Sequence, residues 1–287
     1  MNISDELIQK IREKNNPTVV GLDPFIEQFP PQLVKGRSKA EVAESILAFN
    51  KAIIDAVYDI VPAVKPQLAF YEQYGWQGFK ALEDTVRYAK SRGLFVILDA
   101  KRNDIGSTAA GYAQAYLTES SFNADAITVN GYLGSDGIKP FLDTGRMIFV
   151  LVKTSNPSSG ELQDRKLDDG KTIYETMANL CATWGGDGKP YNNVGIVVGA
   201  TYPEQIAELR TKLPNTFFLI PGYGTQGGKA SDIAKAFDKD GLGAIVNASR
   251  SILYAWKKKE SSNGEDFAEL ARAEAIKMKE DLNNTRV

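Results

Sequence analysis

Short apolar runs alternate with longer amphipathic segments along the whole chain. The short runs are rich in branched aliphatic residues and bounded by turn residues, which is typical of strands buried on both faces. We expect strands at residues 18–22, 61–64, 94–98, 126–129, 147–152, 194–198, 217–220 and 244–246. The segments between them repeat apolar residues every three or four positions, which predicts helices. These helices cover residues 39–58, 77–92, 108–119, 137–142, 172–184, 203–213, 230–237 and 265–282.

This alternation predicts an α/β fold in which eight strands, each followed by a helix, close into a (β/α)8 TIM barrel. We expect one barrel domain over residues 1–287, because no linker or low-complexity segment divides the chain. A doubly wound open sheet is the alternative, but no Gly-x-Gly-x-x-Gly fingerprint follows the first strand. Residues 155–170, together with 184–193, predict an elaborated loop region after strand five, at about 155–193.

Composition narrows the possible partners. A net charge of −2 leaves no basic footprint, so we expect no nucleic-acid partner. No apolar run is long enough to span a membrane and the N-terminus lacks a signal-peptide pattern, so we expect no membrane association. The single cysteine, Cys181, suits a reducing cytoplasm and is expected to be a small buried hydrophobe.

The chain contains no histidine. Ser-His-Asp and Cys-His catalysis are therefore excluded, and so is the commonest ligand of transition metals. A Mg²⁺ ion bound by carboxylates remains possible. Proton transfer must fall to Lys, Asp, Glu, Tyr or Cys181.

The most informative stretch follows the third predicted strand, at residues 99–108. Residues two apart on a strand share a face, so Asp99 and Lys101 are expected to point the same way. Asp104 falls in the following turn, and Ser107 or Thr108 is expected to cap the next helix. Buried charges cost free energy unless they are paired, which makes this cluster a candidate site. The alternative is a purely structural ion pair at a strand end.

Other strand ends carry polar residues as well. In a barrel the carboxyl ends of the strands surround the active site. Asp23 follows strand one, Lys65 follows strand two, Asn130 follows strand four and Lys153 follows strand five. With the Asp99 cluster, the adjacent ends of strands one to three are thus predicted to carry two lysines and two or three carboxylates.

The last two strands carry a different signal. Strand seven leads into a glycine-rich loop at residues 221–228, and strand eight leads into Ser249 and Arg250. Glycines let backbone N–H groups approach an anion, and arginine offers a planar fork of donors. Because loops after strands seven and eight form the usual phosphate site of this fold, we expect a phosphorylated small molecule here. Its reactive end would face the lysines and aspartates.

Lys101 lies between carboxylates, which favours its protonated form. It is therefore expected to be a proton donor rather than a Schiff-base nucleophile. Such an array suits loss of a carboxylate followed by protonation of the remaining carbon.

The segments at residues 21–24, 64–72, 99–108, 154–157, 221–228 and 250–252 together resemble the orotidine 5′-phosphate decarboxylase family. Residues 99–108, DAKRNDIGST, resemble its signature. The segment around Lys65 and the long loop after strand five resemble the longer bacterial (type 2) subfamily. The resemblance covers essentially the whole chain and implies a barrel of the ribulose-phosphate-binding type.

The resemblance implies decarboxylation of orotidine 5′-monophosphate to UMP, the last step of de novo pyrimidine synthesis, in the cytoplasm and without metal or organic cofactor. It implies that Lys101 protonates C6 while Lys65, Asp99 and Asp104 complete the charged array. Asp104 and Thr108 would reach into the neighbouring subunit's site, which implies a homodimer. The remaining implied contacts are Asp23 with the ribose, Ser155 with the pyrimidine, Gln226 and Arg250 with the phosphate, and Pro221 and Ser249 with the substrate. The segment 222–228 is expected to close over the bound phosphate.

Three alternatives stay open. The first is a Mg²⁺-dependent sugar-phosphate decarboxylase, because Asp-x-Lys-x-x-Asp occurs in other barrels that bind phosphates. The second is a Schiff-base aldolase that uses Lys65, Lys101 or Lys153. The third is a non-catalytic nucleotide-binding barrel, against which the costly set of charges argues.

Overall fold

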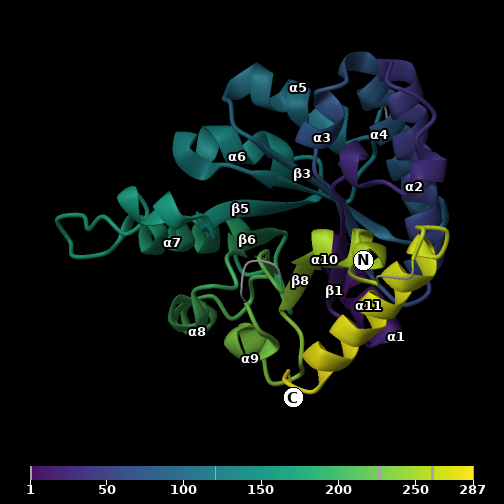
Figure 1. The fold of residues 1–287 in the computed structure, drawn as a ribbon. Coiled ribbons are helices and arrows are strands. Elements are labelled where there is room, and N and C mark those ends of the chain that lie inside the picture. The colour runs from purple at the N-terminus through teal and green to yellow at the C-terminus, as the bar shows by residue number, and fades with distance from the viewer. Residues whose placement is uncertain (1, 120, 225–227, 260–261, 287) are drawn as a thin grey trace.

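The computed structural model describes residues 2–119, 121–224, 228–259 and 262–286, and in these residues eight parallel strands close into a barrel (Figure 1). Each strand pairs with the next, and β8 pairs with β1. The predicted barrel is thus confirmed. The strands are β1 (Thr18–Leu22), β2 (Ala63–Pro66), β3 (Phe95–Arg102), β4 (Ala126–Val129), β5 (Met147–Lys153), β6 (Val194–Val198), β7 (Phe218–Ile220) and β8 (Ala244–Ala248).

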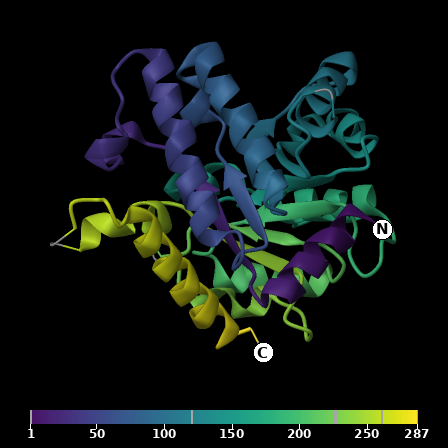
Figure 2. The same cartoon turned by 90° about the vertical axis from the view of Figure 1, so that its right-hand side faces the viewer.

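Helices cover the outside of the barrel, and Figure 2 shows part of this layer, where α2 packs against both α4 and α11. The helices that correspond to predicted ones are α2 (Lys39–Val57), α4 (Gly75–Ser91), α5 (Gly106–Leu117), α6 (Ser135–Leu142), α7 (Ile173–Gly185), α8 (Pro203–Lys212), α9 (Ala230–Ile233) and α11 (Phe267–Asn283). Three helices were not predicted: α1 (Ile3–Lys14), α3 (Ala69–Glu72) and α10 (Arg250–Leu253). Within the described residues, no helix is both long and apolar enough to cross a membrane.

Two apolar layers hold this arrangement together. One fills the space between the strands and the outer helices. The other lies inside the barrel and includes Phe95, Phe149 and Phe217. Each fully buried side chain of this size stabilises the fold by roughly 1.5–3 kcal/mol. Filling the interior leaves the carboxyl ends of the strands as the rigid support of the site.

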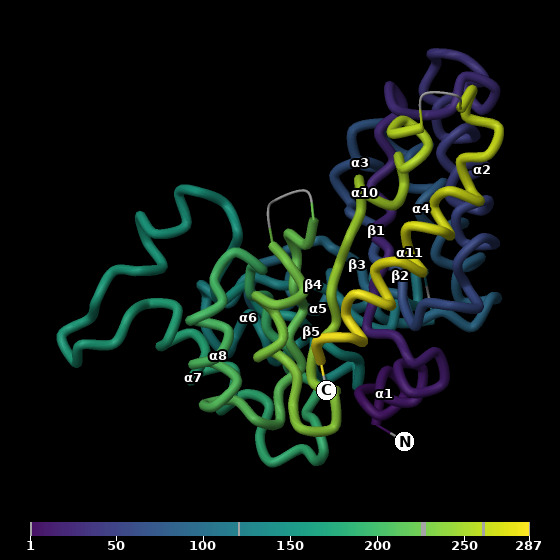
Figure 3. Tube along the Cα trace, turned by 60° about the horizontal axis from the view of Figure 1, so that its bottom comes forward, coloured from purple at the N-terminus to yellow at the C-terminus, as the bar shows by residue number. Residues whose placement is uncertain are grey.

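Helix α1 closes one end of the barrel interior. Its buried residues Leu7, Ile8 and Ile11 join the interior cluster, and Figure 3 shows the helix beyond one end of the strands. A capping box between Asn2 and Asp5 begins the helix. Because β1 begins directly after it, α1 covers the end of the barrel opposite the candidate site.

The connection between β5 and α7, residues 154–172, is called the β5–α7 loop below. It projects from the barrel beyond α7 (Figure 1, teal, at the left). It contains a 3₁₀ turn (Pro157–Glu161) and a bridge between Lys166 and Thr172. Thr172 then forms a capping box with Glu175, which begins α7.

Candidate active site

Asp99 lies between two lysines at the carboxyl end of the barrel. Its Oδ2 is 2.7 Å from Nζ of Lys65 on β2, and its Oδ1 is 2.5 Å from Nζ of Lys101 on β3. Asp99 is 8% exposed and Lys65 is 4% exposed. The structure therefore brings together three of the predicted catalytic residues, and each carboxylate oxygen accepts a bond from its own ammonium group.

Strand alternation alone does not explain how Lys101 reaches Asp99. Lys101 has a φ of 49°, in the left-handed region that non-glycine residues seldom adopt, and the pairing of β3 with β4 shifts register across this stretch. Thr128 on β4 supports this backbone. Its hydroxyl oxygen accepts the N–H groups of Ala100 (3.0 Å) and Lys101 (2.9 Å), and the hydroxyl donates to Oδ1 of Asp99 (2.9 Å). One buried hydroxyl thus fixes both the carboxylate and the backbone of the lysine.

The charges of these groups follow from their surroundings. Burial alone would raise the pKa of Asp99, but Lys65 and Lys101 outweigh it and hold that pKa well below its usual value. Burial would lower the pKa of Lys65, yet Asp99 and Asp23 raise it. For Asp23 burial dominates and raises the pKa, although Lys65 and the Ser249 hydroxyl oppose it. At neutral pH Asp99 and Lys65 are therefore both charged, and Lys65 is a poor Schiff-base nucleophile.

A cavity of about 400 Å³ adjoins the paired charges. Lys65, Asp99 and Lys101 line it, and so do Ser155 and Pro221, two of the predicted substrate contacts. The wall is completed by the side chains of Thr128, Leu151, Thr154, Asn156, Gln163, Val197 and Leu219. Charged groups thus form one part of the wall, and polar residues of the β5–α7 loop form another.

A second cavity, of about 650 Å³, is lined by Asp23 and Arg250, together with Phe25, Phe70 and Tyr254. Asp23 directly follows β1, which pairs with β2 so that Gly21 lies opposite Lys65, and this cavity therefore lies beside the charged array.

The ends of β1 and β8 approach closely between these features. A Cβ atom on Gly21 would lie 2.0 Å from the Ser249 hydroxyl oxygen, so only glycine permits this approach. Ser249 itself lies directly after β8, beside Asp23.

Asp104 and Thr108, which were also predicted to belong to the site, line neither cavity. The Asp104 carboxylate accepts the N–H of Ile105 (2.9 Å), and Thr108 is exposed in the first turn of α5. The expected cap by Ser107 or Thr108 is wrong, because the helix begins at Gly106 and Ile105 precedes it without a side-chain cap. Gln226 lies outside the described residues, as do its neighbours 225 and 227.

Comparison with known proteins identifies the family. The model of the Orotidine 5′-phosphate decarboxylase / HUMPS family matches residues 19–263. This chain belongs to that family. It is 45% identical to an orotidine 5′-phosphate decarboxylase of Rhodopirellula baltica, over 98% of this chain and 99% of that protein. It is 44% identical to one of Caldicellulosiruptor saccharolyticus, over 99% and 98% of the two chains. The structure of Leishmania donovani OMP decarboxylase superposes with a TM-score of 0.76 at 31% identity, over 97% of this chain and 99% of that one.

Two polar residues in the wall of the first cavity, Thr128 and Gln163, were not predicted from the sequence of this orotidine 5′-phosphate decarboxylase family member. Thr128 lies in the middle of a predicted strand, where threonine is common, and no local signal separates it from a core residue. Gln163 lies within the irregular β5–α7 loop, and only the tertiary structure brings it to the cavity.

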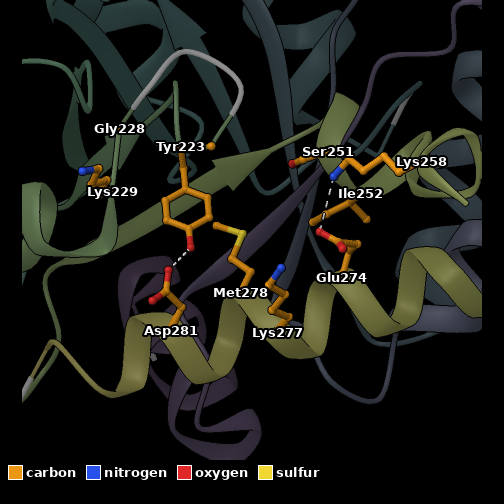
Figure 4. A pocket seen from close by; sticks show the side chains of 11 residues that line it. Tyr223, Gly228, Lys229, Ser251, Ile252, Lys258, Glu274, Lys277, Met278 and Asp281 are labelled. Atoms are coloured by element: carbon orange, nitrogen blue, oxygen red, sulfur yellow. Dashed lines mark hydrogen bonds and ion pairs between the residues drawn. The ribbon is translucent and has the colours of Figure 1, made fainter.

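Figure 4 shows a third cavity, of about 370 Å³, between the loop after β7 and α11. The Tyr223 hydroxyl points toward Asp281 on α11 and donates a hydrogen bond to its carboxylate. Burial and this hydrogen bond raise the pKa of Tyr223, so the phenol keeps its proton. The contact ties the start of the loop predicted to bind phosphate to the last helix.

Other chemistries find less support in the geometry. Lys153, a candidate Schiff-base lysine, is not among the described residues that line the two cavities and pairs with Asp164 at 2.7 Å. In the described part of the chain, no three Asp, Glu or Cys side chains gather into a group that could hold a metal ion.

Proposed function

We propose that this protein decarboxylates orotidine 5′-monophosphate to UMP and CO₂, as part of pyrimidine biosynthesis. The observation that carries the proposal is the Asp99 carboxylate paired with Lys65 and Lys101 in the wall of the first cavity. The sequence identity of 45% and 44% to two orotidine 5′-phosphate decarboxylases, over nearly the full length of the chain, supports the same reaction.

Lys101 is the proton donor in this proposal. The bond between C6 and the carboxylate breaks, CO₂ leaves, and the electron pair stays on C6. The Lys101 ammonium then gives a proton to C6, and the neutral lysine regains one from solvent. Its attraction for the substrate grows as negative charge moves onto the ring carbon, so it stabilises the transition state more than the ground state.

Asp99 and Lys65 set the charge around the proton donor. Asp99 holds the Lys101 ammonium in place, and Lys65 balances the buried carboxylate. Because Asp99 is fixed by three bonds, its position does not change as charge moves in the substrate. Charges that are already in place need no reorganisation when the reaction occurs.

The substrate spans the two cavities in this proposal. Asp23 binds the ribose, Ser155 the pyrimidine, and Arg250 the phosphate, with Pro221 and Ser249 as further contacts. The linings of the two cavities support this order, since Ser155 and Pro221 line the first and Asp23 and Arg250 line the second. Gln226 is proposed as a second phosphate contact on the basis of the family resemblance alone.

The active form is proposed to be a cytoplasmic homodimer in which Asp104 and Thr108 complete the partner's site. Exposed apolar side chains support a subunit interface at this face, where Asp104 and Leu133 both approach Gly137. Ile105 is 53% exposed, Tyr132 is 76% exposed and Leu133 is 43% exposed. Monomeric surfaces seldom cluster such side chains.

The reaction is proposed to need neither metal nor organic cofactor. A UV assay of orotidine 5′-monophosphate consumption by the purified protein in EDTA tests reaction and metal independence together. Loss of substrate absorbance with UMP as product is the expected result. No turnover in EDTA, with Mg²⁺ then giving decarboxylation of a sugar phosphate, would overturn the proposal in favour of the Mg²⁺-dependent enzyme.

A further inference from the structure

Lys153 is a buried charge that the proposed reaction does not use. It ends β5 and is 1% exposed. Leu151, two residues earlier, lines the first cavity, but the pairing of β5 with β6 shifts register between these two residues. Lys153 therefore lies beneath the β5–α7 loop rather than in the cavity wall.

Groups from three other segments surround the Lys153 ammonium. Its Nζ is 2.7 Å from Oδ1 of Asp164 and 3.4 Å from the hydroxyl of Ser159, both in the β5–α7 loop. The ring of Tyr202, before α8, lies 4.5 Å away, and the ring of Tyr174 on α7 lies 5.8 Å away. The Ser159 and Tyr202 hydroxyls are themselves hydrogen-bonded at 2.9 Å. The lysine thus joins the loop to α7 and to the start of α8.

The residue before Asp164 connects this lysine to the cavity. Gln163 accepts the N–H of Thr154 at its Oε1 (3.0 Å) and donates from Nε2 to the Thr154 hydroxyl (2.8 Å). Gln163, Thr154 and Ser155 all line the first cavity. On its other side Ser155 packs against Gly199, where an added Cβ would lie 2.8 Å from the Ser155 Cα. Thr154 and Ser155 are therefore held from two sides.

We infer that Lys153 is a positioning residue for the pyrimidine-binding wall of the site. It fixes the β5–α7 loop, and Gln163 in that loop in turn keeps Thr154 and Ser155 in position. The inference rests on the proposed function, which assigns the pyrimidine to this wall. Lys153 is buried whereas its partner Asp164 is half exposed, and a buried charge often adds no net stability over an apolar side chain of the same shape. The charge of Lys153 is thus better explained by the need to fix one arrangement of a long, polar loop.

Lys153→Met tests this, because methionine keeps the length and apolar stem of the side chain and removes the charge. The expected variant is as resistant to urea as the wild type. Its KM for orotidine 5′-monophosphate and its Kd for UMP rise about tenfold or more, the effect of a small misplacement of binding groups. Its kcat falls much less, and its Kd for ribose 5-phosphate, which lacks the base, stays within about twofold of the wild-type value.

Two further variants keep the test decisive. Gln163→Ala removes the link to Thr154 without touching a buried charge, and it should show the same pattern. Lys212→Met, which removes a paired lysine on the outer surface of α8, is the control and should leave all constants unchanged.

Unchanged UMP affinity in folded Lys153→Met would overturn the inference, and so would equal losses for UMP and ribose 5-phosphate. If Lys153→Met does not fold, Gln163→Ala decides in the same way. A wild-type protein that neither turns over orotidine 5′-monophosphate nor binds UMP would instead contradict the proposed function. The two failures are therefore distinguishable.

Discussion

At the scale of single residues, Asp99 is a buried carboxylate whose charge is stabilised by the groups that bind it. Burial opposes its charge, but Lys65, Lys101 and the Thr128 hydroxyl all bind its two oxygens. Removal of any one partner would leave buried charge or a donor unsatisfied. The same bonds fix the ammonium group that the proposed reaction needs, so structure and chemistry depend on one network.

Thr128→Val should separate this positioning from packing. Valine has the same shape but leaves the Ala100 and Lys101 N–H groups without their acceptor. We expect kcat to fall roughly 10–100-fold, the usual cost of losing a group that orients a site, with little change in the Kd for UMP. Thr128→Ser should keep most of the activity because it keeps the hydroxyl.

Thr18→Val is the matched control for this change. Thr18 is equally buried, on β1, but its hydroxyl finds no partner among the described residues. Its replacement should leave kcat unchanged. An equal loss of kcat in both valine variants would contradict a specific role for Thr128.

Asp23 is the residue at which stability and function should conflict. Its pKa is raised in the folded state, so its negative charge costs stability at any pH well above that pKa. Asp23→Asn should raise the free energy of unfolding at pH 7 by ~0.5–2 kcal/mol, the range of typical stabilising substitutions. The gain should shrink as the pH falls toward 3, where the wild-type carboxyl is also neutral.

Urea unfolding at several pH values measures this, and kcat/KM for orotidine 5′-monophosphate should fall in the same variant. A variant that is less stable than the wild type at pH 7 would show that the charge is favourable where it lies.

At the scale of elements, the sequence predicted the strands well because parallel strands are buried on both faces. The expected ranges of β1, β4 and β6 agree with the structure, whereas β2 lies two residues later than expected. Lys65 therefore lies within β2 rather than after it. Helix α1 was not predicted although Ile3, Leu7, Ile8 and Ile11 have helical spacing, because it precedes the first strand and lies outside the alternation of strands and helices.

The candidate site was predictable to the extent that strand ends meet at one end of a barrel. The convergence of Lys65, Asp99 and Lys101 follows from that topology. The left-handed backbone at Lys101 and the part played by Thr128 do not, because both depend on contacts between β3 and β4 that no local pattern encodes.

Helix α2 offers a direct test of how local signals contribute to stability. The Ser38 hydroxyl accepts the N–H of Glu41, and the Glu41 carboxylate accepts the N–H of Ser38, which forms a capping box. Ser38→Ala should lower the free energy of unfolding by about 1 kcal/mol, measured by urea denaturation. Thr211→Ala, late in α8, is the control and should cost less, since alanine favours helices. Equal losses would argue that the cap contributes nothing of its own.

At the scale of the whole molecule, barrel closure brings distant parts of the chain to one site. Because β8 pairs with β1, the residues after β8 lie beside Asp23, and β2 and β3 follow directly around the barrel. The proposed substrate is thus bound by segments more than 200 residues apart in sequence, between Asp23 and Arg250.

The proposed dimer can be tested by mixing two inactive variants. Lys101→Ala lacks the proton donor, and Asp104→Ala lacks the residue proposed to reach the partner's site. Random exchange of subunits should restore about a quarter of the wild-type activity, since half of the dimers are hybrids with one intact site each. No recovery after exchange has been verified, for example by mass spectrometry, would show that the sites are not shared.

The most direct test of the central claim is the turnover of Lys101→Ala, measured together with its affinity for UMP. We expect a folded protein that binds UMP and whose decarboxylation of orotidine 5′-monophosphate is abolished. Near wild-type turnover in this variant would contradict the proposed mechanism, because the side chain proposed to protonate C6 would be missing.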